Sequence, residues 1–227
     1  MPLDVLLFGA HPDDVEWGIG GTMLLLHDRG VSFAIVDLTA GEMGSRGTAA
    51  QRKAEAAKAA DFVRAGRENL TLPDCGLVDT PETRRLAASA IRRHQPKIVI
   101  APLWEDRHPD HAAAGLIVRN SRLFCGLSTL DDPNPPHKPA AFFFYPIHTF
   151  HPPTFVVDTS VVFDRKLELL RIFHSQFAGT LSGDFLFRLE SRDRYYGSLI
   201  GARHGEALVA DQPIPIGGVE DILSLLE

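Results

Sequence analysis

Short apolar segments alternate with longer segments of helical character through the first hundred residues, and this alternation strongly limits the possible folds. The apolar run at residues 5–10 suits a strand that is buried on both faces. A strand–helix–strand crossover makes the two strands parallel. The sequence therefore predicts an α/β fold with a mostly parallel sheet flanked by helices. The expected strands are residues 5–10, 33–39, 68–72 and 97–101, and the expected helices are residues 14–29, 49–65 and 80–94.

The second half of the chain continues with a less regular pattern. A helix is expected at residues 112–124, and a proline-rich loop at residues 130–139 follows it. Roughly the last twenty residues carry only loose patterning, and nothing in the chain resembles an interdomain linker. We therefore expect one domain spanning residues 1–227. The remaining predicted strands are residues 142–147 and 155–158, and the remaining predicted helices are residues 163–174 and 185–200.

Composition narrows the class of partner. The net charge of −6 is spread over both signs without a basic stripe, which argues against nucleic acid or an anionic membrane as the main partner. The two cysteines, Cys75 and Cys125, are typical of free thiols in a reduced compartment. No secretory signal and no apolar run of about 18 residues is present. We expect a cytoplasmic protein that acts on a small molecule.

Two nearly identical tetrapeptides carry the strongest chemical signal. His-Pro-Asp-Asp occupies residues 11–14, and His-Pro-Asp-His occupies residues 108–111. From the composition, about 0.06 copies of His-Pro-Asp are expected by chance. Each copy follows a predicted strand and opens a helical segment, and ligands of open parallel sheets bind at these carboxyl ends. The two copies are therefore expected to meet in space.

Proline suits the first helical position, so Pro12 and Pro109 predict N-cap positions for the two preceding histidines. Asp14 and His111 then fall in the first helical turn. Aspartate at a helix start is explained by capping and by the helix dipole alone. A cationic histidine there is disfavoured, and the dipole favours its neutral, metal-binding form. This asymmetry favours a metal site over ordinary helix capping.

Two imidazoles and one carboxylate leave one position of a tetrahedral cation open, as in catalytic zinc sites. Such an ion lowers the pKa of its bound water towards neutrality. Asp13, on a different face of the turn from Asp14, is the candidate general base. His108, supported by Asp110, is the candidate cationic donor to a developing oxyanion.

These motifs and their context resemble the LmbE-like, PIG-L-type zinc deacetylases of N-acetylglucosaminyl conjugates. The resemblance rests on residues 9–22, Gly-Ala-His-Pro-Asp-Asp-Val-Glu-Trp-Gly-Ile-Gly-Gly-Thr, together with the second tetrapeptide. The deacetylases of bacillithiol biosynthesis are the more similar branch. The segments that are similar to this branch are Leu-Thr-Ala-Gly-Glu-Met-Gly-Ser-Arg-Gly-Thr at 38–48, Tyr-Pro-Ile-His at 145–148, Ser-Gln-Phe at 175–177 and Tyr-Tyr-Gly-Ser-Leu-Ile-Gly-Ala at 195–202.

The resemblance implies a Rossmann-like sheet and one Zn²⁺ per chain, bound by His11, Asp14 and His111. It also implies that Asp13 activates the attacking water. His108, oriented by Asp110, would stabilise the tetrahedral intermediate and help to protonate the leaving amine. The implied reaction is removal of the acetyl group from an N-acetylglucosaminyl conjugate, with N-acetylglucosaminyl-malate as the expected substrate. A homo-oligomer, trimeric or hexameric, is implied as well.

Substrate contacts are expected from the polar loop at residues 40–48, the helix after it and the strand that ends near residue 147. A guanidinium binds malate carboxylates well, and Arg52 is the preferred candidate from the family pattern. Arg107 either binds substrate or pairs with Glu105. Arg46 is equally well explained as a solvated cation, and His148 as an ordinary surface or core residue. The further candidate contacts are Glu42, Arg46, Tyr145 and His148.

The sequence also has features that bear on functional classes other than deacetylation. The glycines at residues 18–21 fall a turn too late for a dinucleotide-binding loop. A non-catalytic metal-binding or carbohydrate-binding protein would keep the same ligands without turnover. The same metal centre would also serve an inositol-linked or chito-oligosaccharide conjugate, or another amide or ester. The ligand set also accepts iron, cobalt or manganese.

Overall fold

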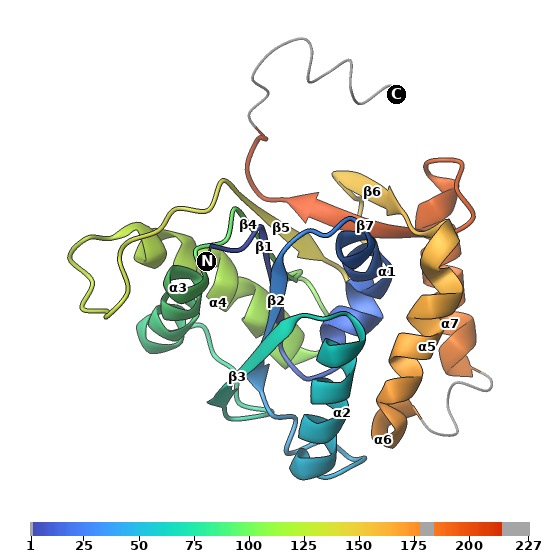
Figure 1. The fold of residues 1–227 in the computed structure, drawn as a ribbon, viewed down its shortest axis with the longest axis horizontal. Helices are drawn as coiled ribbons and strands as arrows, with labels where there is room; N and C mark the ends of the chain where they lie inside the picture. The colour runs from blue at the N-terminus through green and yellow to red at the C-terminus, as the bar shows by residue number, and fades with distance from the viewer. Residues whose placement is uncertain (1, 178–183, 215–227) are drawn as a thin grey trace.

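The computed structural model describes residues 2–177 and 184–214, and it confirms the α/β prediction. Within these residues a sheet of seven strands lies between helices, in the order β3-β2-β1-β4-β5-β7-β6 (Figure 1). The elements in chain order are β1 (Val5–Gly9), α1 (Asp14–Asp28), β2 (Phe33–Thr39), α2 (Ala49–Phe62), β3 (Gly66–Leu72), α3 (Pro81–His94), β4 (Ile98–Pro102), α4 (Pro109–Gly126), β5 (Ala141–Tyr145), β6 (Phe155–Asp158), the short 3-10 helix η1 (Ser160–Val162), α5 (Phe163–Ile172), α6 (His174–Phe177), α7 (Asp184–Ser198) and β7 (Gly205–Ala210).

The order of the strands reverses at β1. The chain first extends the sheet from β1 through β2 to β3, and then returns to place β4 and β5 on the other side of β1. All four of these pairings are parallel, and Val5 and Leu7 of β1 align with Ile98 and Ile100 of β4. The loops that leave the carboxyl ends of β1 and β4 therefore start side by side. Such a reversal is the usual place for a ligand site in an open parallel sheet.

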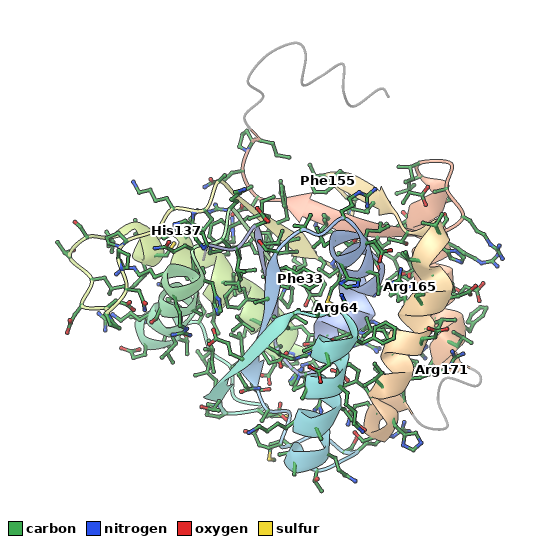
Figure 2. All side chains as sticks on the ribbon, viewed as in Figure 1. Phe33, Arg64, His137, Phe155, Arg165 and Arg171 are labelled. Carbon is green, nitrogen blue, oxygen red and sulfur yellow. The ribbon has the colours of Figure 1, made fainter. Side chains whose placement is uncertain are left out.

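Two apolar layers cover the two faces of the sheet. Successive side chains of a strand point to opposite faces, so Leu7 joins one layer while Leu6 and Phe8 join the other. Helices α1, α2 and α5 lie on the first face, and α3 and α4 lie on the second (Figure 1). Arg165 of α5, labelled in Figure 2, donates a hydrogen bond to Asp28 at the end of α1 at 2.6 Å. Both faces of the central strands are thus removed from solvent.

Strand β7 was missed by the sequence prediction, which left residues 205–210 without a strand. The segment inserts antiparallel between β5 and β6, and it carries Glu206, which is almost fully buried. A buried charge interrupts the apolar pattern by which a strand is recognised. The carboxylate accepts hydrogen bonds from the backbone amides of Gly21 and Thr22 at 2.8 and 2.6 Å and from Lys166 at 2.5 Å.

Glu206 also explains a kink in helix α1, which was expected to be continuous over residues 14–29. Ile19 departs from helical geometry, with φ −137° and ψ 31°. The amides of Gly21 and Thr22 follow this break and donate hydrogen bonds to the carboxylate of Glu206. The carboxylate therefore caps the second half of α1.

The other elements match their predicted ranges within a few residues. Helix α4 begins at Pro109, three residues before the predicted start, and α5 ends at Ile172. Strands β2 and β6 have the predicted bounds.

Among the described helices, none combines the length and apolarity needed to cross a membrane.

Gly115 packs α4 tightly against the end of β4 and the residues that follow it. An added Cβ atom there would lie 2.6 Å from the carbonyl oxygen of Pro102 and 2.6 Å from the amide nitrogen of Trp104, and neither backbone atom can move aside easily. Gly115→Ala should therefore lower the free energy of unfolding by about 1–3 kcal/mol, as measured by urea denaturation. Gly66→Ala is the control, because its Cβ would meet only Ala34 at 3.6 Å, and it should change stability by less than about 0.5 kcal/mol. Equal losses would contradict this account of the packing.

Candidate active site

The two tetrapeptides meet at the carboxyl ends of β1 and β4. One potential ligand atom each from His11, Asp14 and His111 lies within 4.8 Å of the others, and all three residues are buried. Asp14 stands between the imidazoles, with Oδ2 3.4 Å from His11 Nδ1 and Oδ1 3.2 Å from His111 Nε2. The structure therefore brings together the three residues that the sequence suggested as metal ligands.

The two helix starts differ in detail. At α4 the expectation holds, because His108 is the N-cap and Pro109 is the first helical residue. At α1 the N-cap is Asp13 rather than His11, and its backbone has a φ of 128°. A non-glycine residue in this region is strained, and such strain is often found at functional sites. The amide of His11 donates to Asp14 Oδ2 at 2.8 Å, which fixes the tight turn.

A second layer of carboxylates contacts the far nitrogens of both imidazoles. His11 Nε2 lies 3.0 Å from Asp74 Oδ1, and His111 Nδ1 lies 3.3 Å from Asp106 Oδ1. Metal-binding histidines usually carry such a partner, which sets the tautomer and the ring orientation. Sequence analysis missed Asp74 and Asp106. Both follow the carboxyl ends of strands, β3 and β4, and this position was the only available signal.

The electrostatics of this cluster favour positive charge at the imidazoles. Burial disfavours protonation, but Asp14 outweighs it and raises the pKa of His11 to about 9 and that of His111 to about 10. Burial opposes ionisation of Asp14, yet the charge of His111 holds the pKa of Asp14 well below its usual range. A divalent cation would supply this charge in place of the protons. Two alternative groups of possible metal ligands lie nearby. His11 forms one with Asp74 and Asp110, and His111 forms the other with Asp106 and His148.

Asp13 lies beside the cluster and faces the pocket. Burial raises its pKa to about 7, against the opposing charge of Arg52. One terminal nitrogen of Arg52, Nη2, lies 3.2 Å from Asp13 Oδ1 and also donates to the carbonyl of Pro12 at 3.0 Å. The other, Nη1, donates to the carbonyl of Gly41 at 3.1 Å. Arg52 was expected to bind substrate; although it lines the pocket, its terminal nitrogens hold the Asp13 turn and the loop after β2.

His108 differs from the cationic donor that was expected. Burial and the positive charge of His111 lower its pKa, which favours the neutral imidazole. Its Nδ1 accepts a hydrogen bond from the backbone amide of Asp110 at 3.2 Å, which leaves the proton on Nε2. His108 can therefore donate a hydrogen bond through Nε2 without carrying a charge.

Asp110 was expected to orient His108, but its carboxylate does not contact His108. Instead the carboxylate accepts from the amides of Cys75 and Leu77 at 2.7 and 3.2 Å, and it lies 3.4 Å from His11 Nε2. The contact of Asp110 with His108 is made by its backbone amide. The carboxylate thus ties the loop after β3 to the start of α4.

An open pocket of about 350 Å³ covers the cluster. Ligand sites usually measure roughly 300–1,000 Å³, so this pocket is large enough for one small ligand. Its polar wall includes Asp13, His108 and His148, and its apolar wall includes Trp17 and Phe185. Sequence analysis named the loop at residues 40–48 and the strand end near residue 147 as sources of substrate contacts, but it did not single out several individual residues of this lining. These residues are Trp17, Met43, Gly44, Ser45, Cys75, Ile147, Gln176, Phe177 and Phe185.

The remaining predicted substrate contacts divide into three groups. His148 lines the pocket, and its ring centroid lies 5.1 Å from that of His111. Tyr145 is fully buried and donates to the carbonyl of Phe8 at 2.8 Å, so its hydroxyl belongs to the core and not to the pocket. Glu42 accepts from the amide of Asp74 at 2.9 Å, and Arg46 donates to the carbonyl of Gln176 at 3.2 Å. These two exposed residues hold loops together at the rim.

Comparisons with known proteins agree with the fold and identify the family. The family model for GlcNAc-PI de-N-acetylase, PIG-L, matches residues 6–121. Diacetylchitobiose deacetylase of Thermococcus kodakarensis is 31% identical over 220 residues, which cover 90% of this chain and 81% of that protein. A probable N-acetyl-alpha-D-glucosaminyl L-malate deacetylase of Bacillus anthracis is 29% identical over 198 residues, or 77% of this chain and 81% of that one.

Among solved structures, the conserved protein TT1542 from Thermus thermophilus superposes with a TM-score of 0.88. Its sequence is 37% identical, and the match covers 94% of this chain and 97% of that one. The chain therefore belongs to the PIG-L family of de-N-acetylases. The resemblance suggested by the sequence is confirmed at the level of the family, and relatives with two different substrates are similar to this chain.

Arg52 should behave as a structural residue whose loss destabilises the protein. Arg52→Met removes three hydrogen bonds of a buried guanidinium and leaves Asp13 without its cation. We expect the free energy of unfolding to fall by about 2–4 kcal/mol in urea denaturation. Arg46→Met is the matched control at an exposed position and should cost less than about 0.5 kcal/mol. If Arg52→Met were as stable as the control, the positioning role would be wrong, and the predicted contact of Arg52 with substrate would be favoured instead.

Proposed function

We propose that this protein is a zinc-dependent N-deacetylase that hydrolyses the acetamide of an N-acetylglucosaminyl conjugate. The observation that carries the proposal is the convergence of His11, Asp14 and His111 at the base of an open pocket, with Asp13 beside them. Membership of the PIG-L family supports deacetylation of this class of sugar. We further propose that the chain acts as one domain with one zinc ion and assembles as a homo-oligomer.

The donor set fits zinc. Two imidazole nitrogens and one carboxylate are typical ligands of catalytic zinc, and Asp74 and Asp106 provide the outer contacts that such histidines usually have. When bound there, zinc would lower the pKa of a coordinated water and polarise the acetamide carbonyl. His11, Asp14 and His111 would hold the ion. The residues around them then have separate tasks.

Asp13 is the proposed general base, because its carboxylate lines the pocket next to Asp14 and is held in place by Arg52. It would accept a proton from the attacking water and return it to the leaving amine. His108 would donate a hydrogen bond from Nε2 to the developing oxyanion. A neutral imidazole serves this task, so protonation of the amine is assigned to Asp13 and no longer to His108.

Two substrates are supported by named relatives. The diacetylchitobiose deacetylase is the more similar of the two curated relatives and favours a chito-oligosaccharide. The relative named as a malate deacetylase favours N-acetylglucosaminyl-malate, the conjugate expected from the sequence. Both carry the same N-acetylated sugar, and the pocket of about 350 Å³ suits that part of the molecule.

Replacing the proposed base tests catalysis separately from metal binding. Asp13→Asn should bind zinc at a near-normal level, because Asp13 is not a proposed ligand, and should lower the rate by a factor on the order of 10² or more. Released acetate would be measured with N-acetylglucosaminyl-malate, diacetylchitobiose, an inositol conjugate and free N-acetylglucosamine. Asp131→Asn, at an exposed loop position, is the matched control and should retain full activity.

Two outcomes would contradict the proposal. An unchanged rate in Asp13→Asn would reject the role of this carboxylate. Absence of acetate release by the zinc-loaded wild type from every substrate would indicate a non-catalytic metal-binding or carbohydrate-binding protein.

A further inference from the structure

A second cavity of about 220 Å³ adjoins the metal pocket. The two share Trp17, Ile147 and His148 in their walls. Its volume lies below the roughly 300–1,000 Å³ of a complete ligand site, so it suits a part of a ligand and not a whole one. A substrate whose acetamide lies in the first pocket would extend its remaining part into this second space.

The walls of this second cavity come from two segments. One is the chain after β5, where His148 and Phe150 lie, and the other is α7, which contributes Phe187, Arg188 and Ser191. Phe187 and Ser191 are four residues apart and therefore lie on the same face of the helix. Arg107, at the start of the second tetrapeptide loop, completes the cavity.

Both walls are fixed by hydrogen bonds. The buried Arg192 of α7 donates from Nη2 to the carbonyl of Trp17 at 2.6 Å and from Nη1 to the carbonyl of Ile147 at 3.4 Å. The amide of His148 donates to Asp106 Oδ2 at 2.8 Å, and the hydroxyl of Thr149 donates to the carbonyl of Glu105 at 2.7 Å. The cavity is therefore formed in advance, which limits the ordering cost of binding.

The charge of this cavity is positive. Three arginines line it, and none of its lining residues in the described part of the chain is acidic. Arg192 is paired with Asp193 at 2.9 Å. Arg107 and Arg188 have no ion-pair partner among the described residues, and Glu105, the partner considered for Arg107, lies 3.7 Å from His151 instead. Two exposed guanidiniums at one cavity are thus available to a ligand.

Exposed aromatic side chains accompany the two guanidiniums. Phe150 and Phe187 are 63% and 71% exposed, and both line the cavity instead of contributing to the core. Exposed apolar groups that gather at a cavity usually mark a binding surface. They would contact the carbon skeleton of a bound group while the arginines bind its charge.

We propose that this cavity is a subsite for the substituent that the N-acetylated sugar carries, and that Arg107 and Arg188 select a substituent bearing carboxylates. This inference rests on the proposed deacetylase function and specifies its substrate class. Guanidinium groups bind carboxylates through paired, charge-assisted hydrogen bonds. A dicarboxylate such as malate therefore fits the site better than a second neutral sugar.

The ratio of kcat/KM for N-acetylglucosaminyl-malate to that for diacetylchitobiose tests the subsite. In Arg188→Gln this ratio should fall by about 10 to 100-fold, because the malate conjugate loses a guanidinium that binds its carboxylates, whereas diacetylchitobiose has no carboxylates. Arg85→Gln is the matched control, since Arg85 is an exposed arginine on α3, on the opposite face of the sheet, and should leave the ratio unchanged. An equal ratio in wild type and Arg188→Gln would overturn the proposal.

Calorimetric binding of the deacetylated product, glucosaminyl-malate, separates failure of the subsite from failure of the enzyme assignment. Arg188→Gln should weaken this binding by a similar factor of about 10 to 100, whether or not any acetate is released. If Arg188→Gln bound the product more weakly while the wild type released no acetate, the subsite would be supported and the deacetylase function rejected. Equal affinity of the wild type, Arg188→Gln and Arg85→Gln for the product would reject the subsite itself.

Discussion

The adjacency of β1 and β4 is the constraint on which the site depends. The strand order reverses at this point, so two loops that are about a hundred residues apart in the chain start from neighbouring positions. Each of these short loops leads into a helix, and the first turns of the two helices carry Asp14 and His111. Close packing of Gly115 against the end of β4 holds the second helix in place. The site is therefore a property of the sheet topology, and the loops supply its chemistry.

The buried charged groups around the carboxyl ends of β1 and β4 each have a partner. Asp74 and Asp106 orient the two imidazoles, Arg52 holds the strained turn at Asp13, and Glu206 caps the broken helix α1. Unpaired buried charges are costly, so each of these groups needs its partner. These networks join β3, β4, α1 and β7 to the same region. The rigidity that a catalytic constellation requires follows from this shared anchoring.

The sequence predicted the central fold because its signals are local. Apolar runs, helix starts marked by proline and the spacing of His11 and Asp14 can be recognised without knowledge of tertiary contacts. The missed features depend on contacts between distant segments. Strand β7 was not recognised because the charge of Glu206 is buried against Lys166, which is forty positions away in the chain. Asp74 can orient an imidazole only because the fold places it beside His11. Tyr145 was misplaced because the direction of a side chain at the end of a strand depends on the register of the sheet.

The location of the bound metal tests the central claim most directly. Crystals of the zinc-loaded protein would be measured by anomalous diffraction on both sides of the zinc absorption edge. We predict one strong peak per chain between His11 Nδ1, the carboxylate of Asp14 and His111 Nε2, and the loss of this peak in His111→Ala. A peak at Asp106 and His148 instead, or no peak at full zinc saturation, would contradict the proposed centre.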